Sequence, residues 1–408
     1  MASTISYTEI PSDFWQHLAR IQVEIQALDV NATSNNFQSF TSVFHQTDQF
    51  YVLLALLALL TKTSALSLAP PVTFFFSLTF LAAIYFFTLD LARRTPLPNV
   101  QINSIAVLST LLTGLWLGTA TFAYIRYYAF FPTMLNFALF YSSMIIFLDH
   151  TSEARNKRTA IALLPFLFLT MVVIHLQEAL FLIVMVSGIL FWKFARILLN
   201  LEKASNHQYH LIRNWALFAG VIWLGLIFYA LFFREMNPWG HTPHVVDAGA
   251  AFSLQFPIPI ANPTFRFWDT LAPFGVIVFI WYFIERHRFR YIDYLNVGML
   301  SPLFTFLNPA YTWLFLHFGS STALWRTAYL MPLGIVAAFL IISTLSVSNE
   351  RQQLPKKSRS FLFSFALVVS LLPLSIGDFE NRNSRLPSFA NVNKHSGADL
   401  WGDLITEV

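Results

Sequence analysis

The sequence VTFFFSLTFLAAIYFFTLDLA, residues 72–92, carries no charged side chain before Asp90. A helix needs about 20 mostly apolar residues to cross the hydrocarbon core of a bilayer, and this stretch supplies them. We therefore predict a membrane-spanning helix here.

The composition of the whole chain indicates the same environment. Of its 408 residues, 56% are hydrophobic and 11% are Asp, Glu, Lys or Arg, whereas an ordinary soluble domain carries about 25% charged residues. So few charges could not cover the surface of a soluble protein of this length. The chain is predicted to be an integral membrane protein, which excludes collagen, disulfide scaffolds and disordered chains. It has no cysteine, so a disulfide, a thiolate nucleophile and Cys-ligated zinc are excluded as well.

Similar apolar stretches recur along the chain. Further spans are predicted at residues 102–124, 128–148, 215–233, 268–284, 327–348 and 361–376. Residues 159–195 are interrupted at His175 and are predicted to form two shorter helices. Residues 293–318 are interrupted at Asn308-Pro309, which predicts a broken helix or a span plus a half-span. Residues 50–67 hold an apolar run too short for a span, which favours a short interfacial or re-entrant helix. The predicted fold class is an all-α polytopic bundle of about 9–11 membrane helices with an amphipathic N-terminal helix.

The basic residues predict the orientation. Five loops are rich in Lys and Arg: 93–94, 155–158, 193–213, 286–290 and 351–359. Placing all five in the cytoplasm gives one consistent alternation of spans. Residues 1–49 are then an extracytoplasmic amphipathic region and 50–376 a transmembrane domain. The loop 234–267 and the tail 377–408 face outside, and we expect a span before residue 1 and a distal domain beyond the tail. The net charge of +4 is spread along the chain and does not favour nucleic-acid binding.

Polar residues concentrate first in the N-terminal segment SDFWQHLARI, residues 12–21. Asp13 and His17 are four positions apart, so a helix over 12–28 would place them on one face. A carboxylate and an imidazole there could share a metal ion or a proton. The neighbouring face carries an apolar stripe suited to lying along a membrane surface, formed by Phe14, Leu18 and Ile21. The alternative is a capped amphipathic helix without chemistry, with Ser12 or Asp13 as its N-cap.

The exterior loop 234–267 is the second polar segment. It contains His241, His244 and Asp247, a set of side chains that could ligate a divalent metal ion. Its prolines predict a rigid, extended loop rather than a helix. The alternative is that these histidines are simply solvated.

A third set lies near the predicted outer membrane face. Ionisable groups at membrane depth are costly, so they line a cavity or pair with each other. Arg126 and Arg326 would suit a phosphate, because a guanidinium meets phosphate oxygens with two parallel hydrogen bonds. The alternatives are that both arginines are interfacial anchors and that His175 and Glu178 are a polar pair joining two helices.

The segment DFWQHLARI, residues 13–21, resembles the first extracytoplasmic loop of multispanning glycosyltransferases of the GT-C superfamily, in which an aspartate is typically catalytic. Three later segments are similar to the same group. They are RYYAFFP (126–132), HLQEALF (175–181), and Asn308-Pro309 followed by WRTAYLMP (325–332).

The resemblance implies transfer of a sugar from a polyprenyl-phosphate carrier, a membrane lipid, to an acceptor outside, in a bacterial inner or plasma membrane. Asp13 would be the general base or a metal ligand, and Arg326 and Arg126 would hold the donor phosphate. His244 and Asp247 would cover the site, and His17 and His175 would contact substrate. The resemblance does not imply a cofactor common to all members, but some members use a divalent metal ion. The candidate metal ligands in this chain are Asp13, His17, His241 and His244.

On this interpretation Asp13 and Arg326 face one exterior cavity, roughly 6–15 Å apart and bridged by substrate. Three alternatives remain open. A transporter or flippase for a lipid or polar solute would need paired charges inside the spans. O-antigen polymerases and ligases also use an exterior loop rich in His and Arg. The third is a non-catalytic structural membrane subunit. Nothing in the sequence indicates the oligomeric state.

Overall fold

The computed structural model describes residues 12–28, 49–115, 132–151, 157–199, 201, 205–233, 252–255, 260–263, 265–289, 291–318 and 321–346. These residues form twelve α-helices, two 3-10 helices and one antiparallel hairpin. In chain order the elements are α1 (Ser12–Leu28), α3 (Gln49–Thr61), α4 (Ala65–Arg93), α5 (Asn99–Leu115), α7 (Pro132–Thr151), α8 (Lys157–Ile174), α9 (Leu176–Leu198), α10 (Asn206–Phe233), β1 (Phe252–Gln255), β2 (Ile260–Pro263), α11 (Phe265–Glu285), η4 (Arg286–Phe289), α12 (Asp293–Phe304), α13 (Pro309–Phe318), η5 (Ser321–Leu330) and α14 (Leu333–Ser346).

Within these ranges, five helical stretches are long and apolar enough to cross a membrane. They are Ala65–Arg93, Pro132–Thr151, Leu176–Leu198, Gln208–Phe233 and Arg326–Thr344. Gln49–Thr61 and Ala162–Ile174 are apolar but shorter. The chain is therefore a multi-pass membrane protein made chiefly of helices. Five such stretches are fewer than the number of spans predicted, and the predicted span 361–376 lies outside the described residues.

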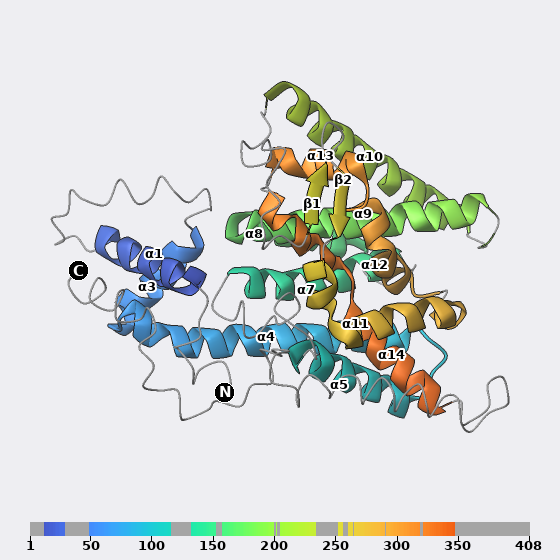
Figure 1. Cartoon of the computed structure of the whole chain (residues 1–408), viewed down its shortest axis with the longest axis horizontal. Coiled ribbons are helices and arrows are strands. Elements are labelled where there is room, and N and C mark those ends of the chain that lie inside the picture. The colour runs from blue at the N-terminus through green and yellow to red at the C-terminus, as the bar shows by residue number, and fades with distance from the viewer. Residues whose placement is uncertain are drawn as a thin grey trace.

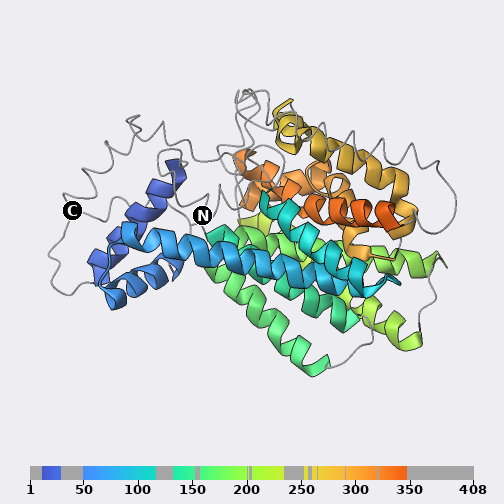
Figure 2. The same cartoon turned by 90° about the horizontal axis from the view of Figure 1, so that it is seen from below.

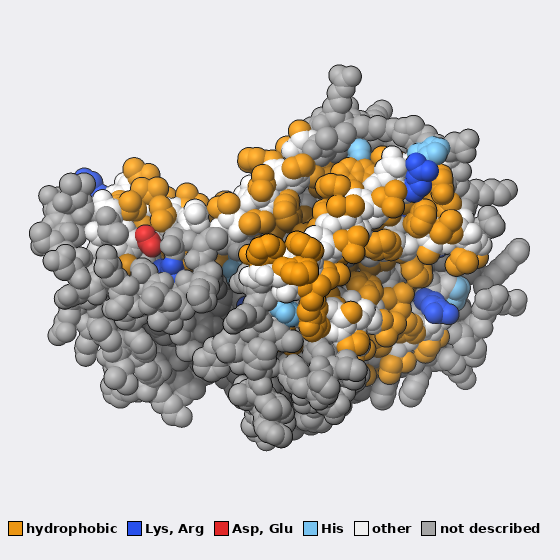
Figure 3. Space-filling view, turned by 90° about the horizontal axis from the view of Figure 1, so that it is seen from above, with side chains coloured by type: hydrophobic (Ala, Val, Ile, Leu, Met, Phe, Trp, Pro, Cys, Tyr) orange, Lys and Arg blue, Asp and Glu red, His pale blue; other side chains and the backbone are white. Residues whose placement is uncertain are grey.

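Helices α4 and α9 run along the horizontal direction of Figure 1, whereas α10 and α14 cross it obliquely. Helix α4 packs against α5 and α7, α14 packs against α5, and α7, α8 and α9 contact one another. Helices α1 and α3 lie together beyond one end of this bundle, and α4 extends from them along its length (Figure 2). Helix α10 lies outermost against α9, and hydrophobic side chains cover much of the face shown in Figure 3. Exposed apolar side chains such as Val221 and Leu224 suit contact with lipid.

The ends of α3 and α4 explain why the predicted segment 50–67 does not form one helix. Lys62 has a φ of 54°, the left-handed conformation that ends many helices, and the Thr63 N–H bonds back to the Ala58 carbonyl at 3.0 Å. Ser64 then caps α4 by accepting from the Ser67 N–H at 3.1 Å. Helix α3 is short, as predicted, but ends at Thr61, and α4 begins seven residues before the predicted span.

The two predicted helix breaks are confirmed, and one other prediction is corrected. Helices α8 and α9 meet at His175, whose backbone is extended, and α12 and α13 are separated at Asn308. The Asn308 side chain accepts from the Ala310 N–H at 3.0 Å and Pro309 opens α13, the usual order at a helix start. The predicted span 327–348 corresponds to the apolar stretch Arg326–Thr344, whose first residues belong to the 3-10 helix η5. Part of the loop 234–267 is paired as β1 and β2, which the all-α prediction missed.

Helix α1 spans Ser12–Leu28, as predicted, but the described part of its apolar stripe faces the protein. Leu18 and Ile21 are almost fully buried and belong to the hydrophobic core, because α1 packs against α3 and α4. The side chain of Phe14, the third member, lies outside the described residues. The stripe therefore attaches α1 to the protein.

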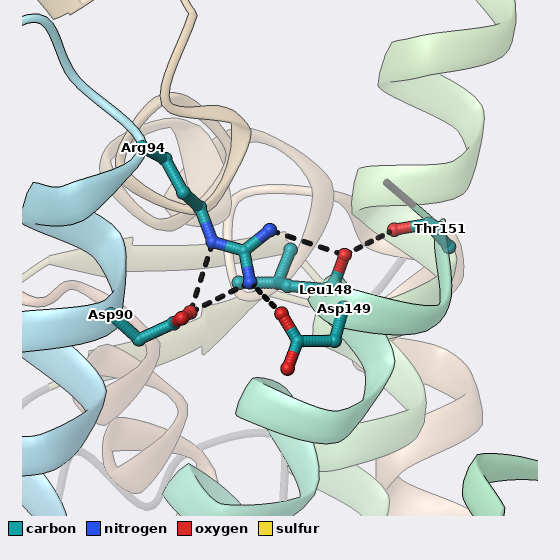
Figure 4. A network of polar contacts seen from close by, with 5 residues as sticks. All are labelled: Asp90, Arg94, Leu148, Asp149 and Thr151. Carbon is teal, nitrogen blue, oxygen red and sulfur yellow. Dashed lines mark hydrogen bonds and ion pairs between the residues drawn. The ribbon is translucent and has the colours of Figure 1, made fainter. Parts of the chain in front are cut away.

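One end of the bundle is held by ion pairs. Arg94, at the end of α4, contacts Asp90, Asp149 and the Leu148 carbonyl at the end of α7 (Figure 4). At the end of α9, Arg196 and Lys193 bind Asp293 of α12 at 2.9 and 3.5 Å. We call this region the ion-pair end.

Candidate functional site

At the opposite end, the break at His175 is held by a buried amide. The Asn136 Nδ2 of α7 donates to the Met171 carbonyl at 2.9 Å and to the His175 carbonyl at 2.7 Å. Asn136 is fully buried, so its amide supplies donors to the backbone where α8 stops and α9 begins. Since α7 and α9 meet here at their N-terminal ends, they run parallel, and their C-terminal ends lie together at the ion-pair end.

Glu178 connects this break to η5. It is fully buried, and its Oε2 accepts from the His175 Nδ1 at 2.5 Å. Its Oε1 accepts from the Gln177 Nε2 at 3.1 Å, and the Gln177 Oε1 accepts from the Arg326 Nη1 at 3.1 Å. A continuous chain of hydrogen bonds therefore joins a buried carboxylate to a guanidinium far away in sequence.

Helices α1 and α3 contribute a second group of side chains. His17 of α1 and Tyr51 of α3 share a hydrogen bond of 2.6 Å between Nδ1 and the hydroxyl, and their rings stack at 5.6 Å. The Arg20 guanidinium lies over the same tyrosine ring, 5.1 Å from its centroid, in a cation–π arrangement. Tyr51 thus holds the polar face of α1 against α3.

The charged side chains near the helix break also act on His17 of the second group. The pKa of His17 falls from 6.5 to about 3, chiefly because burial disfavours the charged ring. Coulombic interaction with His175, Arg326 and Arg20 lowers it further. His17 is therefore a neutral imidazole in a positively charged environment. We call His17, Arg20, His175 and Arg326 the histidine end.

Three of the residues selected from sequence thus lie together: His17, His175 and Arg326. Sequence reasoning missed Arg20, Tyr51 and Gln177. The spacing of Arg20 three positions after His17 put it within reach of the same face, but Tyr51 sits in an apolar run and gave no polar signal. It becomes informative only when α1 and α3 are seen to pack together.

The remaining candidates cannot be placed. Asp13 belongs to α1, one helical turn before His17, but its side chain lies outside the described residues. Arg126, His241, His244 and Asp247 also lie outside them. Within the described part of the chain, no three His, Asp or Glu side chains form a group that could hold a metal ion. The cations around His17 also disfavour a metal ion on that ring.

Comparison of the chain with protein-family models, with curated proteins and with solved structures gave no significant match. Its function must therefore be argued from the histidine end and from the arrangement of the helices.

Proposed function

We propose that this protein is a membrane glycosyltransferase of the GT-C type, which moves a sugar from a polyprenyl-phosphate carrier to an acceptor at the histidine end. One observation carries the proposal. The helix that bears Asp13 also bears His17, and His17 lies within electrostatic reach of Arg326. A base for the acceptor and a cation for the leaving phosphate would then belong to one site.

The proposed step assigns a role to each group. The acceptor oxygen bonds to the anomeric carbon as the bond from that carbon to the phosphate oxygen breaks. Asp13 removes the acceptor proton as general base, and Arg326 stabilises the charge on the departing phosphate. Arg126 is a second phosphate ligand in this scheme, and His244 and Asp247 cover the site from the loop. A role for Asp13 as metal ligand remains the alternative.

The distribution of charge favours an enzyme over a transporter. In the long helices of the described ranges, charged residues lie near the helix ends: Asp90 in α4, Asp149 in α7, Glu178 and Arg196 in α9. A transporter binds its solute near the bilayer midplane. A site at one membrane face instead suits a lipid-linked donor, whose phosphate lies at that depth.

The test is sugar transfer in liposomes that contain the purified protein, a set of labelled polyprenyl-phosphate sugars and acceptor. Asp13→Asn is compared with Glu24→Gln, which removes a carboxylate from the same helix. Loss of a general base should lower turnover by about 10²–10⁴-fold in the Asp13 variant, with donor binding retained, and the Glu24 variant should behave as wild type. Transfer at the wild-type rate by the Asp13 variant would contradict the proposal.

A further inference from the structure

Gln177 lies between two charged groups of opposite sign. Its amide nitrogen donates to Glu178 and its amide oxygen accepts from Arg326, each at 3.1 Å. A carboxylate can only accept hydrogen bonds and a guanidinium can only donate them. The amide therefore has one orientation that satisfies both neighbours, and that orientation directs its oxygen at Arg326.

The carboxylate that fixes the amide is itself fixed. Glu178 is fully buried and accepts from His175, and the Asn136 amide lies 3.5 Å from the same oxygen. Gln177 thus connects the helix break between α8 and α9, where Glu178 is fixed, to the 3-10 helix η5, which carries Arg326. A guanidinium binds phosphate through a planar set of N–H donors that must point at the phosphate oxygens. The orientation of the Arg326 guanidinium therefore affects how well it binds phosphate.

We propose that Gln177 is the positioning residue that orients Arg326 toward the phosphate of a lipid-linked ligand; the choice of ligand rests on the proposed function. An amide at this position has a specific advantage. It accepts a hydrogen bond from the guanidinium without bringing a negative charge against it, whereas a carboxylate at 177 would pair with Arg326 and compete with the phosphate.

Exchanging two neighbouring side chains tests this directly. The double variant Gln177→Glu with Glu178→Gln keeps the net charge and can form the same hydrogen bonds, except that the bond between 177 and 178 reverses its direction, because the amide at 178 then donates to the carboxylate at 177. Otherwise the exchange changes only the place of the negative charge. In wild type the amide of Gln177 separates the carboxylate of Glu178 from Arg326, and in the variant the carboxylate contacts Arg326 directly. A second variant, Gln177→Leu, removes the hydrogen bond without adding charge. The control is Gln208→Glu in the first turn of α10, where Gln208 bonds to Ser205 and is not part of the site.

Binding is measured with farnesyl phosphate, and with uncharged farnesol, on protein in nanodiscs. Wild type and the Gln208 variant should bind farnesyl phosphate alike and in preference to farnesol. The exchange variant should bind it about 10- to 100-fold more weakly, the effect expected when a charge-assisted hydrogen bond is lost. Gln177→Leu should weaken it less, and farnesol binding should not change in either variant.

The outcomes separate this inference from the proposed function. Weaker phosphate binding by the exchange variant supports the role of Gln177 even if no sugar transfer is ever detected. Unchanged phosphate binding by that variant overturns it, even if the protein transfers sugar. Wild-type protein that does not prefer farnesyl phosphate over farnesol also overturns it. Equal weakening for farnesol and farnesyl phosphate would indicate a folding defect and would equally count against a positioning role.

Discussion

The close contact between α5 and α14 should make Gly334→Ala destabilising. A Cβ atom at position 334 would lie 3.0 Å from the backbone nitrogen of Thr113 and 3.1 Å from its Cα. These are backbone atoms, so rotation of the Thr113 side chain cannot relieve the clash and one helix must shift. Forcing extra volume into a packed core typically costs about 1–3 kcal/mol.

The helix preference of alanine opposes this cost only in part. Replacing glycine by alanine favours a helix interior by up to about 1 kcal/mol, and position 334 lies in the first turn of α14, where the benefit is smaller. We therefore expect a net loss of about 1–2 kcal/mol in the free energy of unfolding. Gly220 of α10 provides the matched control, because a Cβ atom there would meet nothing within 4 Å.

Reversible unfolding in mixed micelles, followed by tryptophan fluorescence, measures both variants. Gly334→Ala should unfold at a lower denaturant concentration than wild type, and Gly220→Ala at the same or a higher one. Because α14 follows η5, the Gly334 variant should also bind farnesyl phosphate more weakly. A Gly334 variant as stable as the Gly220 variant would refute the packing argument.

Three further predictions concern charge. Arg94→Met should lower stability by about 0.5–1.5 kcal/mol, a small loss because Arg94 and its two carboxylate partners are between 26% and 50% exposed; chemical unfolding measures it. The lowered pKa of His17 means that the unfolded chain binds more protons between pH 3 and 6.5, so stability should fall with falling pH across that window. Replacing His17 by Gln should flatten this dependence in thermal unfolding. In the cysteine-free chain, a cysteine introduced at His287 should react with an impermeant maleimide only from the cytoplasmic side, and labelling from outside would reverse the orientation.

Sequence was informative wherever the bilayer itself imposes the pattern. Apolar length predicted α4 and α7, and the polar interruption at His175 predicted the boundary between α8 and α9, because lipid penalises both short helices and buried charge. The apolar stripe of α1 was misread, since the same residues suit a lipid surface and a protein surface equally well. Lys62 in a left-handed conformation had no local signal, because lysine rarely adopts it.

The candidate site was predicted less completely, for a related reason. Arg326 and His175 stood out as ionisable residues in apolar surroundings, and both act electrostatically on His17. Gln177 was unremarkable as a polar residue beside a helix start. Its importance comes from a hydrogen bond to a residue of η5, and no periodicity in a single sequence encodes such a contact.

The position of the ion pairs at one end has an electrical consequence. A charge senses membrane voltage only if it moves through the field, at about 2.3 kcal/mol per elementary charge and 100 mV. The ion-pair end holds three cations and three carboxylates, all near helix ends, so its charges balance. Tilting or sliding of the helices at this end would carry almost no net charge across the low-dielectric layer. Energising or collapsing the membrane potential should therefore leave the conformation of the ion-pair end nearly unchanged.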